Sequence, residues 1–234
     1  MATEGSSPAL QQLIKDDAVR QLRQQKGLMA TLGSEDGAFK LDWVEGVQRL
    51  LADNAMLEQV EAEAREIWER GIRHIIWAGM GGSIMAVRVL TDLGFCSSRN
   101  SRHMTIYPLD STDPAALNGI VREIAEAKNL ALPTGEESSN PAFLQALLND
   151  IMMIGVSMGM TSEEPITHLE WFTDLLKQAG LRPAAHLLVM TLPGSYLDRF
   201  AHEQQAPSLP LQLDGGTGTG CLLYTSPSPR DRQK

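Results

Sequence analysis

The stretch that decides the fold is Trp77–Ala86, WAGMGGSIMA, in which three glycines and a serine follow an apolar run. The run, residues 72–77, predicts a buried strand, and the apolar residues Ile84, Val87 and Leu90 behind the glycines predict a helix. Glycines allow a tight turn and let a ligand approach the backbone closely. Because the start of a helix offers N–H groups to an anion, this stretch predicts a strand–turn–helix unit that can hold one.

Beyond this stretch, short apolar runs alternate with helical segments. The expected strands are residues 72–78, 104–109, 151–156, 186–191 and 209–213. Repeated strand–helix alternation is typical of a parallel sheet with helices on both faces. The sequence therefore predicts an α/β fold with a doubly wound parallel sheet of about five strands. N-terminal helices are expected before it, at residues 10–25 and 41–70.

Several helix boundaries are marked by their residue types. Asp113-Pro114 and Asn140-Pro141 each combine an N-cap residue with a proline suited to the first turn. After Ser162, the sequence Glu163-Glu164-Pro165 places acids and a proline in a first helical turn, where they suit the helix dipole better than acid–base chemistry. Gly71 is typical of a residue that ends a helix.

The composition limits the classes of ligand and partner. The chain has 234 residues, and its 20 Lys+Arg against 29 Asp+Glu give a formal net charge of −9, which argues against nucleic acid. Two cysteines, Cys96 and Cys221, are too few for a disulfide framework or a zinc site. The five histidines lack metal-ligand spacing, and their expected role is structural or on the surface.

Targeting signals are not visible in the sequence. The first residues, MATEGSSPAL, lack a basic region followed by an apolar core, as a secretory signal requires. No apolar run approaches the roughly 20 residues that a membrane-spanning helix needs. We therefore expect a cytoplasmic protein with no membrane contact.

In a doubly wound sheet, ligands bind beyond the carboxyl ends of the strands, where the connections diverge. Three segments are expected there: Gly79–Ser83, Ser157–Ser162 and Asp214–Gly220. The second supplies three hydroxyls, those of Ser157, Thr161 and Ser162, which suit a phosphate monoester at a helix start. Helix capping alone would explain this segment, but two adjacent anion-compatible loops favour a phosphate.

A dinucleotide fingerprint, G-x-G-x-x-G, is the alternative for the first loop. Gly79 and Gly81 fit it, and Asp110 stands where a ribose-binding acid would follow the second strand. The third glycine position is Ile84, which spoils the close helix–strand packing that glycine permits. The sequence also lacks a Gly-Lys-Ser/Thr phosphate loop.

Three motifs together resemble phosphoglucose isomerases, particularly the isomerase part of bifunctional transaldolase/phosphoglucose isomerase proteins. They are GMGGS at 79–83, LDSTDPAAL at 109–117 and VSMGMTSEEP at 156–165. The resemblance implies a sugar-isomerase (SIS) domain over residues 41–220, after a helical or disordered segment at 1–40. It also implies which residues hold the substrate phosphate: Gly81, Gly82, Ser83, Ser157, Thr161 and Ser162.

The resemblance further implies a reaction, the interconversion of glucose 6-phosphate and fructose 6-phosphate in glycolysis and gluconeogenesis, without metal or organic cofactor. The ligand would be a small-molecule sugar phosphate, and the family's common dimeric state suggests a homodimer for the parent protein. Two departures weaken the phosphate site, because Met158 replaces the family's lysine and Gly159 replaces its next hydroxyl residue. A noncatalytic sugar-phosphate-binding module on the same fold remains an alternative.

The last residues change character abruptly. Residues 221–231, CLLYTSPSPRD, resemble the translation of a transposase sequencing adapter, and a natural disordered tail is the alternative. On the first interpretation, residues 221–234 are not native. The family's catalytic arginine, glutamate, histidine and lysine are then expected beyond the end of the chain, and the chain is expected to be an inactive N-terminal fragment.

Overall fold

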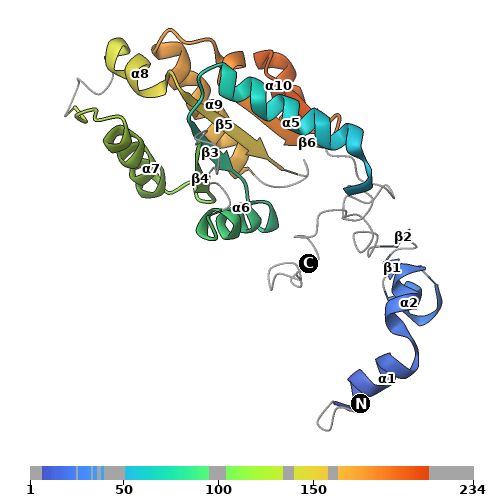
Figure 1. Ribbon diagram of the computed structural model, residues 1–234. Coiled ribbons are helices and arrows are strands. Elements are labelled where there is room, and N and C mark those ends of the chain that lie inside the picture. The colour runs from blue at the N-terminus through green and yellow to red at the C-terminus, as the bar shows by residue number, and fades with distance from the viewer. Residues whose placement is uncertain are drawn as a thin grey trace. The chain divides into compact units, whose positions relative to one another are not determined.

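A computed structural model describes residues 7–24, 26–32, 34–35, 38–39, 51–94, 104–133, 140–157 and 163–210 (Figure 1). The chain divides into two compact units, Met1–Gln59 with Leu213–Lys234 and Val60–Gln212. The larger unit contains a five-stranded sheet. No helix among the described residues is both long and apolar enough to cross a membrane.

The sheet consists of parallel strands throughout. Its members are β3 (His74–Ala78), β4 (Thr105–Leu109), β5 (Ile151–Val156), β6 (Leu187–Thr191) and β7 (Ser208–Pro210). Their order is β4-β3-β5-β6-β7, and every neighbouring pair is parallel. The predicted doubly wound parallel sheet is therefore confirmed. The last strand begins one residue before the expected 209–213, and residues 211–213 lie outside the described part.

Helices lie before and between these strands along the chain. They are α5 (Asn54–Glu69), α6 (Gly82–Asp92), α7 (Pro114–Ala127), α8 (Pro141–Leu148), α9 (Glu164–Gln178) and α10 (Tyr196–Gln204), with a short 3₁₀ turn at Pro183–Ala185. The expected caps of α7 and α8 are confirmed, because the Asp113 and Asn140 side chains each accept from an N–H two residues later at 2.9 Å. The N-cap of α9 is Glu163, one residue later than Ser162, since its carbonyl accepts from the Thr167 N–H at 3.0 Å.

Gly71 ends α5 as predicted. Its φ of 92° is in the left-handed region that glycine adopts without strain. The N–H of Gly71 donates to the Trp68 carbonyl at 3.0 Å, and the N–H of Ile72 donates to the Ile67 carbonyl at 3.4 Å. This pair of hydrogen bonds is a common helix C-terminal closure. Of the helix expected at 41–70, residues 41–50 lie outside the described part, and α5 begins only at Asn54, because the chain is not helical at Asp53.

The smaller unit has short helices and strands in its described part. It contains α1 (Pro8–Lys15), α2 (Ala18–Arg23), α3 (Gly27–Leu32) and an antiparallel pair, β1 (Ser34–Glu35) with β2 (Ala38–Phe39). The single helix expected at 10–25 was wrong, because Asp17 adopts a left-handed φ of 51° between α1 and α2. Aspartate favours helices weakly and tolerates this conformation, so the consecutive Asp16 and Asp17 provide a break.

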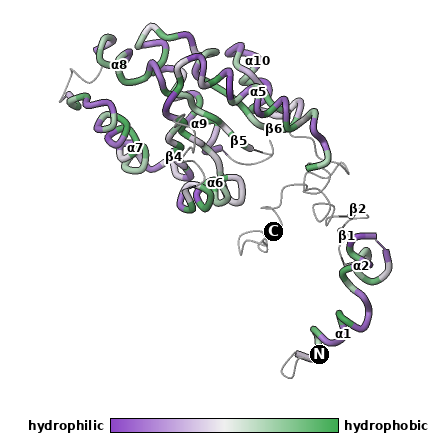
Figure 2. The backbone as a smooth tube through the Cα atoms, viewed as in Figure 1, coloured by the Kyte–Doolittle hydropathy of each residue, from purple (hydrophilic) through white to green (hydrophobic). Residues whose placement is uncertain are grey.

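Apolar cores lie on both faces of the sheet. One face packs against α7, α8, α9 and α10, and β5 is buried along its whole length (Figure 1). On the other face, Ile67 of α5 packs with Ile75, Met152 and Ile154. Figure 2 shows hydrophobic and hydrophilic residues alternating along α5 and α7, as expected for amphipathic helices.

Candidate functional site

The chain changes direction between β3 and β5 in the larger unit. From β3 it runs through α6 to β4 on one side, and from β5 it runs through α9 to β6 on the other. Doubly wound sheets bind ligands at the carboxyl end of such a switch point. Gly79 directly follows β3, and Ser157 directly follows β5. A Cβ placed on Gly79 would lie 3.5 Å from the Val156 carbonyl oxygen, so the two strand ends are in close contact.

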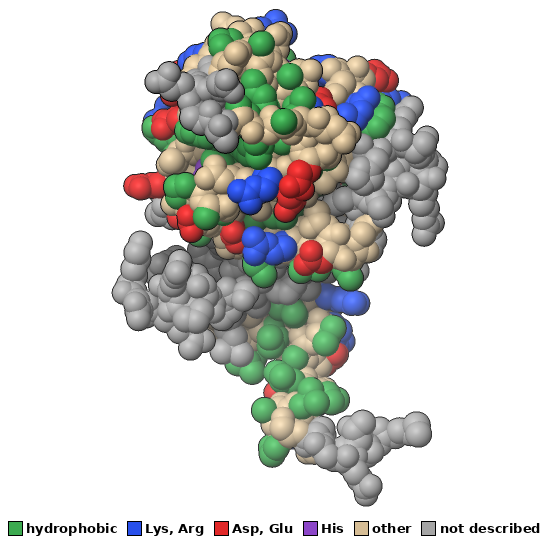
Figure 3. Space-filling model, turned by 90° about the vertical axis from the view of Figure 1, so that its left-hand side faces the viewer, with side chains coloured by type: hydrophobic (Ala, Val, Ile, Leu, Met, Phe, Trp, Pro, Cys, Tyr) green, Lys and Arg blue, Asp and Glu red, His purple; other side chains and the backbone are tan. Residues whose placement is uncertain are grey.

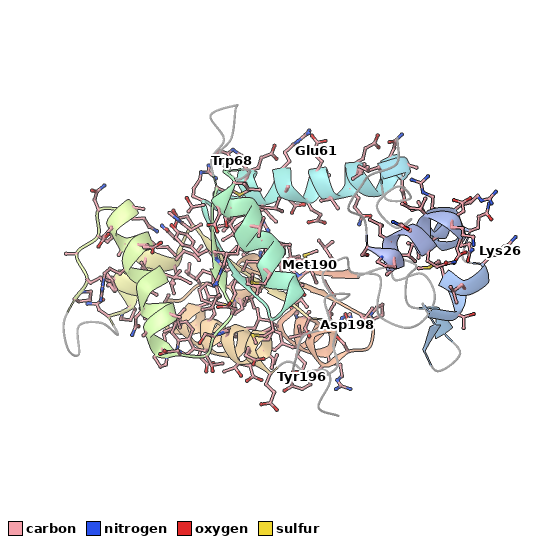
Figure 4. The ribbon with its side chains drawn as sticks, turned by 90° about the horizontal axis from the view of Figure 1, so that it is seen from below. Lys26, Glu61, Trp68, Met190, Tyr196 and Asp198 are labelled. Carbon is pink, nitrogen blue, oxygen red and sulfur yellow. The ribbon has the colours of Figure 1, made fainter. Side chains whose placement is uncertain are left out.

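Four helices start at the carboxyl edge of the sheet. In two of them, side chains accept hydrogen bonds from N–H groups at the helix start. Asp113 caps α7. At α10, the Ser195 hydroxyl accepts from the Asp198 N–H at 3.1 Å, while the Asp198 carboxylate accepts from the Gly194 N–H at 2.8 Å. The hydrogen bond from the Gly194 N–H lowers the pKa of Asp198 below its usual value. Figure 4 labels Met190 and Asp198, which mark the end of β6 and the start of α10. An anion would have to displace a carboxylate to reach the α10 start.

The other two helices, α6 and α9, flank the switch point. In the part of the chain that the structure describes, neither has a side-chain hydrogen bond at its N-cap, which is Gly81 for α6 and Glu163 for α9. The first N–H groups of a helix need partners, and its N-terminus carries a partial positive charge. Within the described ranges, the two helix starts beside the switch point therefore differ from those of α7 and α10 in that their N-cap side chains make no cap hydrogen bond.

The backbone conformation of Gly81 sets the direction in which α6 begins. Its φ of 56° and ψ of −130° belong to a region that essentially only glycine occupies. A Cβ on Gly81 would meet no atom within 4 Å, so the backbone conformation, and not the space, demands glycine.

Replacing Gly81 by alanine should therefore lower the free energy of unfolding by about 1–3 kcal/mol, the usual cost of such backbone strain. Urea unfolding followed by circular dichroism measures this effect. Gly119 in α7 is the control, because it has equally open surroundings without a positive φ, so Gly119→Ala should stabilise by about 0.5–1 kcal/mol. Equal effects at the two positions would contradict the strained geometry at Gly81.

The structure brings four of the six predicted phosphate residues together. Gly81 is the N-cap of α6, Gly82 and Ser83 are its first two residues, and Ser157 follows β5, the strand adjacent to β3. Ser157 is buried, and its N–H donates to the Met190 carbonyl of β6 at 3.2 Å. Thr161 and Ser162 lie outside the described residues. The same holds for Met158, Gly159 and the predicted third segment, 214–220.

Sequence reasoning missed the role of Arg88, which sits on α6. Its guanidinium forms an ion pair with Asp110 at 3.1 Å, directly after β4. Because Asp110 already has a cationic partner, it is a poor acid for binding a ribose. A lone arginine gave no signal in the sequence, since its partner is 22 residues away.

His168 on α9 is a second residue whose contact was missed. It is only 5% exposed, and its Nε2 lies 3.1 Å from the Ser111 carbonyl oxygen. Burial lowers the pKa of His168 below 6.5, and the Ser111 carbonyl partly opposes this. Because a carbonyl only accepts, Nε2 carries the hydrogen and donates it. This bond joins α9 to the β4–α7 turn (Asp110–Asp113).

The amino edge of the same sheet has a separate polar network. Lys128 donates to the Leu147 carbonyl at 2.8 Å and to Asp150 at 2.5 Å. His186, 7% exposed, lies with Nδ1 2.8 Å from the Ile151 carbonyl, and burial lowers its pKa. Ligands of doubly wound sheets bind beyond the carboxyl ends of the strands, and this network lies at the opposite edge. In the described ranges, His, Cys, Asp and Glu side chains form no group of three that could hold a metal.

Comparison with protein-family models gives no match, and comparison with curated proteins gives none either. Among solved structures, a hypothetical protein from Thermus thermophilus is similar, with a TM-score of 0.55 and 18% identity over 92% of this chain and 45% of that one. A glucose-6-phosphate isomerase from Chlamydia trachomatis has a TM-score of 0.48 and 18% identity, over 71% of this chain and 29% of that one. The chain spans less than half the length of either protein. The first likeness shows that the α/β fold is shared.

Proposed function

We propose that the larger unit binds the phosphate group of a sugar phosphate at the starts of α6 and α9. The observation that carries the proposal is the pair of helix starts beside the switch point, where, among the described residues, neither N-cap residue makes a side-chain cap hydrogen bond. Backbone N–H groups at a helix start, together with the helix dipole, favour a phosphate without further cations. The motif resemblance to phosphoglucose isomerases gives independent support from the sequence.

The binding chemistry is local. The chain has a net charge of −9, and on the face shown in Figure 3 acidic and basic side chains lie beside one another. A dianion is therefore held by directed hydrogen bonds rather than by a broad positive field. On this proposal Gly82 and Ser83 offer N–H groups, and the hydroxyls of Ser83, Ser157, Thr161 and Ser162 donate to phosphate oxygens.

The reaction that we propose for the parent protein is the aldose–ketose interconversion of glucose 6-phosphate and fructose 6-phosphate. A base moves a proton between C1 and C2 through an enediol, while the phosphate site fixes the substrate relative to that base. Phosphate binding is equal in ground and transition states, so it positions the substrate without lowering the chemical barrier itself. The base and the group that stabilises the enediolate must be supplied by other residues.

The proposal predicts that Ser157→Ala and Ser83→Ala each weaken fructose 6-phosphate binding by about 5–150-fold, because each removes a hydrogen bond to a charged group. Isothermal titration of the full chain measures this, with fructose as the ligand that lacks phosphate. Ser195→Ala is the control, since Ser195 caps α10 and bonds to Thr191 at 2.8 Å. Ser195→Ala should lower the free energy of unfolding without changing the affinity for fructose 6-phosphate. Wild-type affinity in both Ser157→Ala and Ser83→Ala would contradict the proposed site.

A further inference from the structure

The β4–α7 turn contacts both helices that flank the switch point. At one end, Asp110 pairs with Arg88 of α6 at 3.1 Å. At the next residue, the Ser111 carbonyl accepts from His168 of α9 at 3.1 Å. The turn also holds its own shape, because the Asp113 N–H donates to the Ser111 hydroxyl at 3.1 Å. Two adjacent residues of one turn are thus bonded to the two helices that flank the switch point.

We infer that His168 and Arg88 are positioning residues, which fix the starts of α9 and α6 relative to each other through the β4–α7 turn and thereby set the affinity of the phosphate site. This inference rests on the proposed function. It adds residues that need not touch the ligand. His168 lies one helical turn after Glu164, the first residue of α9, and Arg88 lies in the second turn of α6.

Apolar packing alone would leave these helices free to shift. Leu169, next to His168, packs α9 against β5, but such contacts have little directionality and tolerate small sliding movements. Hydrogen bonds weaken steeply when distance or angle changes. The His168 bond is also shielded, because the side chain is 5% exposed, so water competes for it poorly. It is therefore suited to hold α9 at one position relative to the turn.

The placement matters because, on the proposed function, one phosphate takes donors from both helix starts at once. If α9 then shifted by a fraction of an ångström, its donors would lose their alignment with a phosphate held at the start of α6. The effect would fall on affinity and much less on the fold, since α9 keeps its apolar contacts.

The test compares His168 with His186. Both are buried, both have a lowered pKa, and both bond to a backbone carbonyl, but His186 lies at the opposite edge of the sheet. His168→Leu and His186→Leu should both lower the melting temperature. Only His168→Leu should weaken fructose 6-phosphate and inorganic phosphate binding, by about tenfold. His168→Gln keeps an N–H donor near Nε2 and should restore most of the affinity.

Arg88→Gln tests the other anchor without disturbing the core, because the Arg88 side chain is 44% exposed. It should weaken phosphate binding by about threefold, as expected for the loss of an exposed ion pair. Wild-type affinity in both His168→Leu and Arg88→Gln, or an equal loss in His186→Leu, would overturn the inference and leave the proposed function intact. A wild-type chain that binds neither fructose 6-phosphate nor phosphate would overturn both.

Discussion

Replacing Phe172 by alanine should lower the free energy of unfolding of the larger unit by about 3–5 kcal/mol. Phe172 lies on α9, is 1% exposed and belongs to the core between the sheet and helices α7 to α10. Removing the ring loses its transfer free energy and leaves a cavity that the surrounding side chains fill only in part. The midpoint and slope of a urea unfolding curve give the change directly.

Its neighbour Trp171 provides a matched control for this prediction. Trp171 is a larger aromatic residue on the same helix, but it is 38% exposed. Trp171→Ala should therefore cost about 1 kcal/mol or less, although it removes more atoms. Equal effects of the two substitutions would contradict the assignment of Phe172 to the buried face of α9 and of Trp171 to its exposed face.

The sheet could be predicted because each strand is an apolar run bounded by polar or glycine residues. Residues 151–156 illustrate this, since all six are buried in the observed strand. The caps of α7 and α8 were predictable for a similar reason, because Asp113 and Asn140 act on N–H groups only two residues away. Such caps can be predicted because they depend only on residues close together in the sequence.

The break at Asp17 shows where local patterns fail. The apolar residues before and after it continue with helical spacing, so periodicity predicts one helix. The backbone instead turns at two consecutive aspartates, and the Asp16 side chain accepts from Gln12 at 2.8 Å. A short exposed helix gains little from continuing, since burial and not propensity supplies most helical stability.

The candidate site was predictable only in part, and for a related reason. Glycines and hydroxyl residues directly after strands mark Gly79–Ser83 and Ser157 within the sequence. The bonds from Arg88 to Asp110 and from His168 to Ser111 join residues 22 and 57 positions apart. No pattern in a single sequence encodes such pairs, because they depend on how α6 and α9 pack against the sheet.

Gly155 lies where α9 packs closely against the sheet. A Cβ at this position in β5 would overlap Cδ1 of Leu169 on α9. Leu169 is 0% exposed, so its side chain has no solvent to move into. The backbone of β5 cannot retreat either, because Gly155 lies opposite Ala78 of β3 and Val189 of β6. Glycine is therefore what allows α9 to pack this closely.

Gly155→Val should consequently destabilise the larger unit by about 3 kcal/mol, at the upper end for overpacking of a core. Leu169→Ala alone should also destabilise, by about 2–5 kcal/mol, because it leaves a cavity. In the double variant the valine methyl groups occupy part of that cavity. The free energy of unfolding that the double variant loses should therefore be smaller than the sum of the two single losses, by about 1–3 kcal/mol. Urea unfolding of the four proteins in this cycle measures the coupling. If the two losses of stability were strictly additive, α9 would not pack on β5 at Gly155. The contact that places the start of α9 beside the switch point would then be absent.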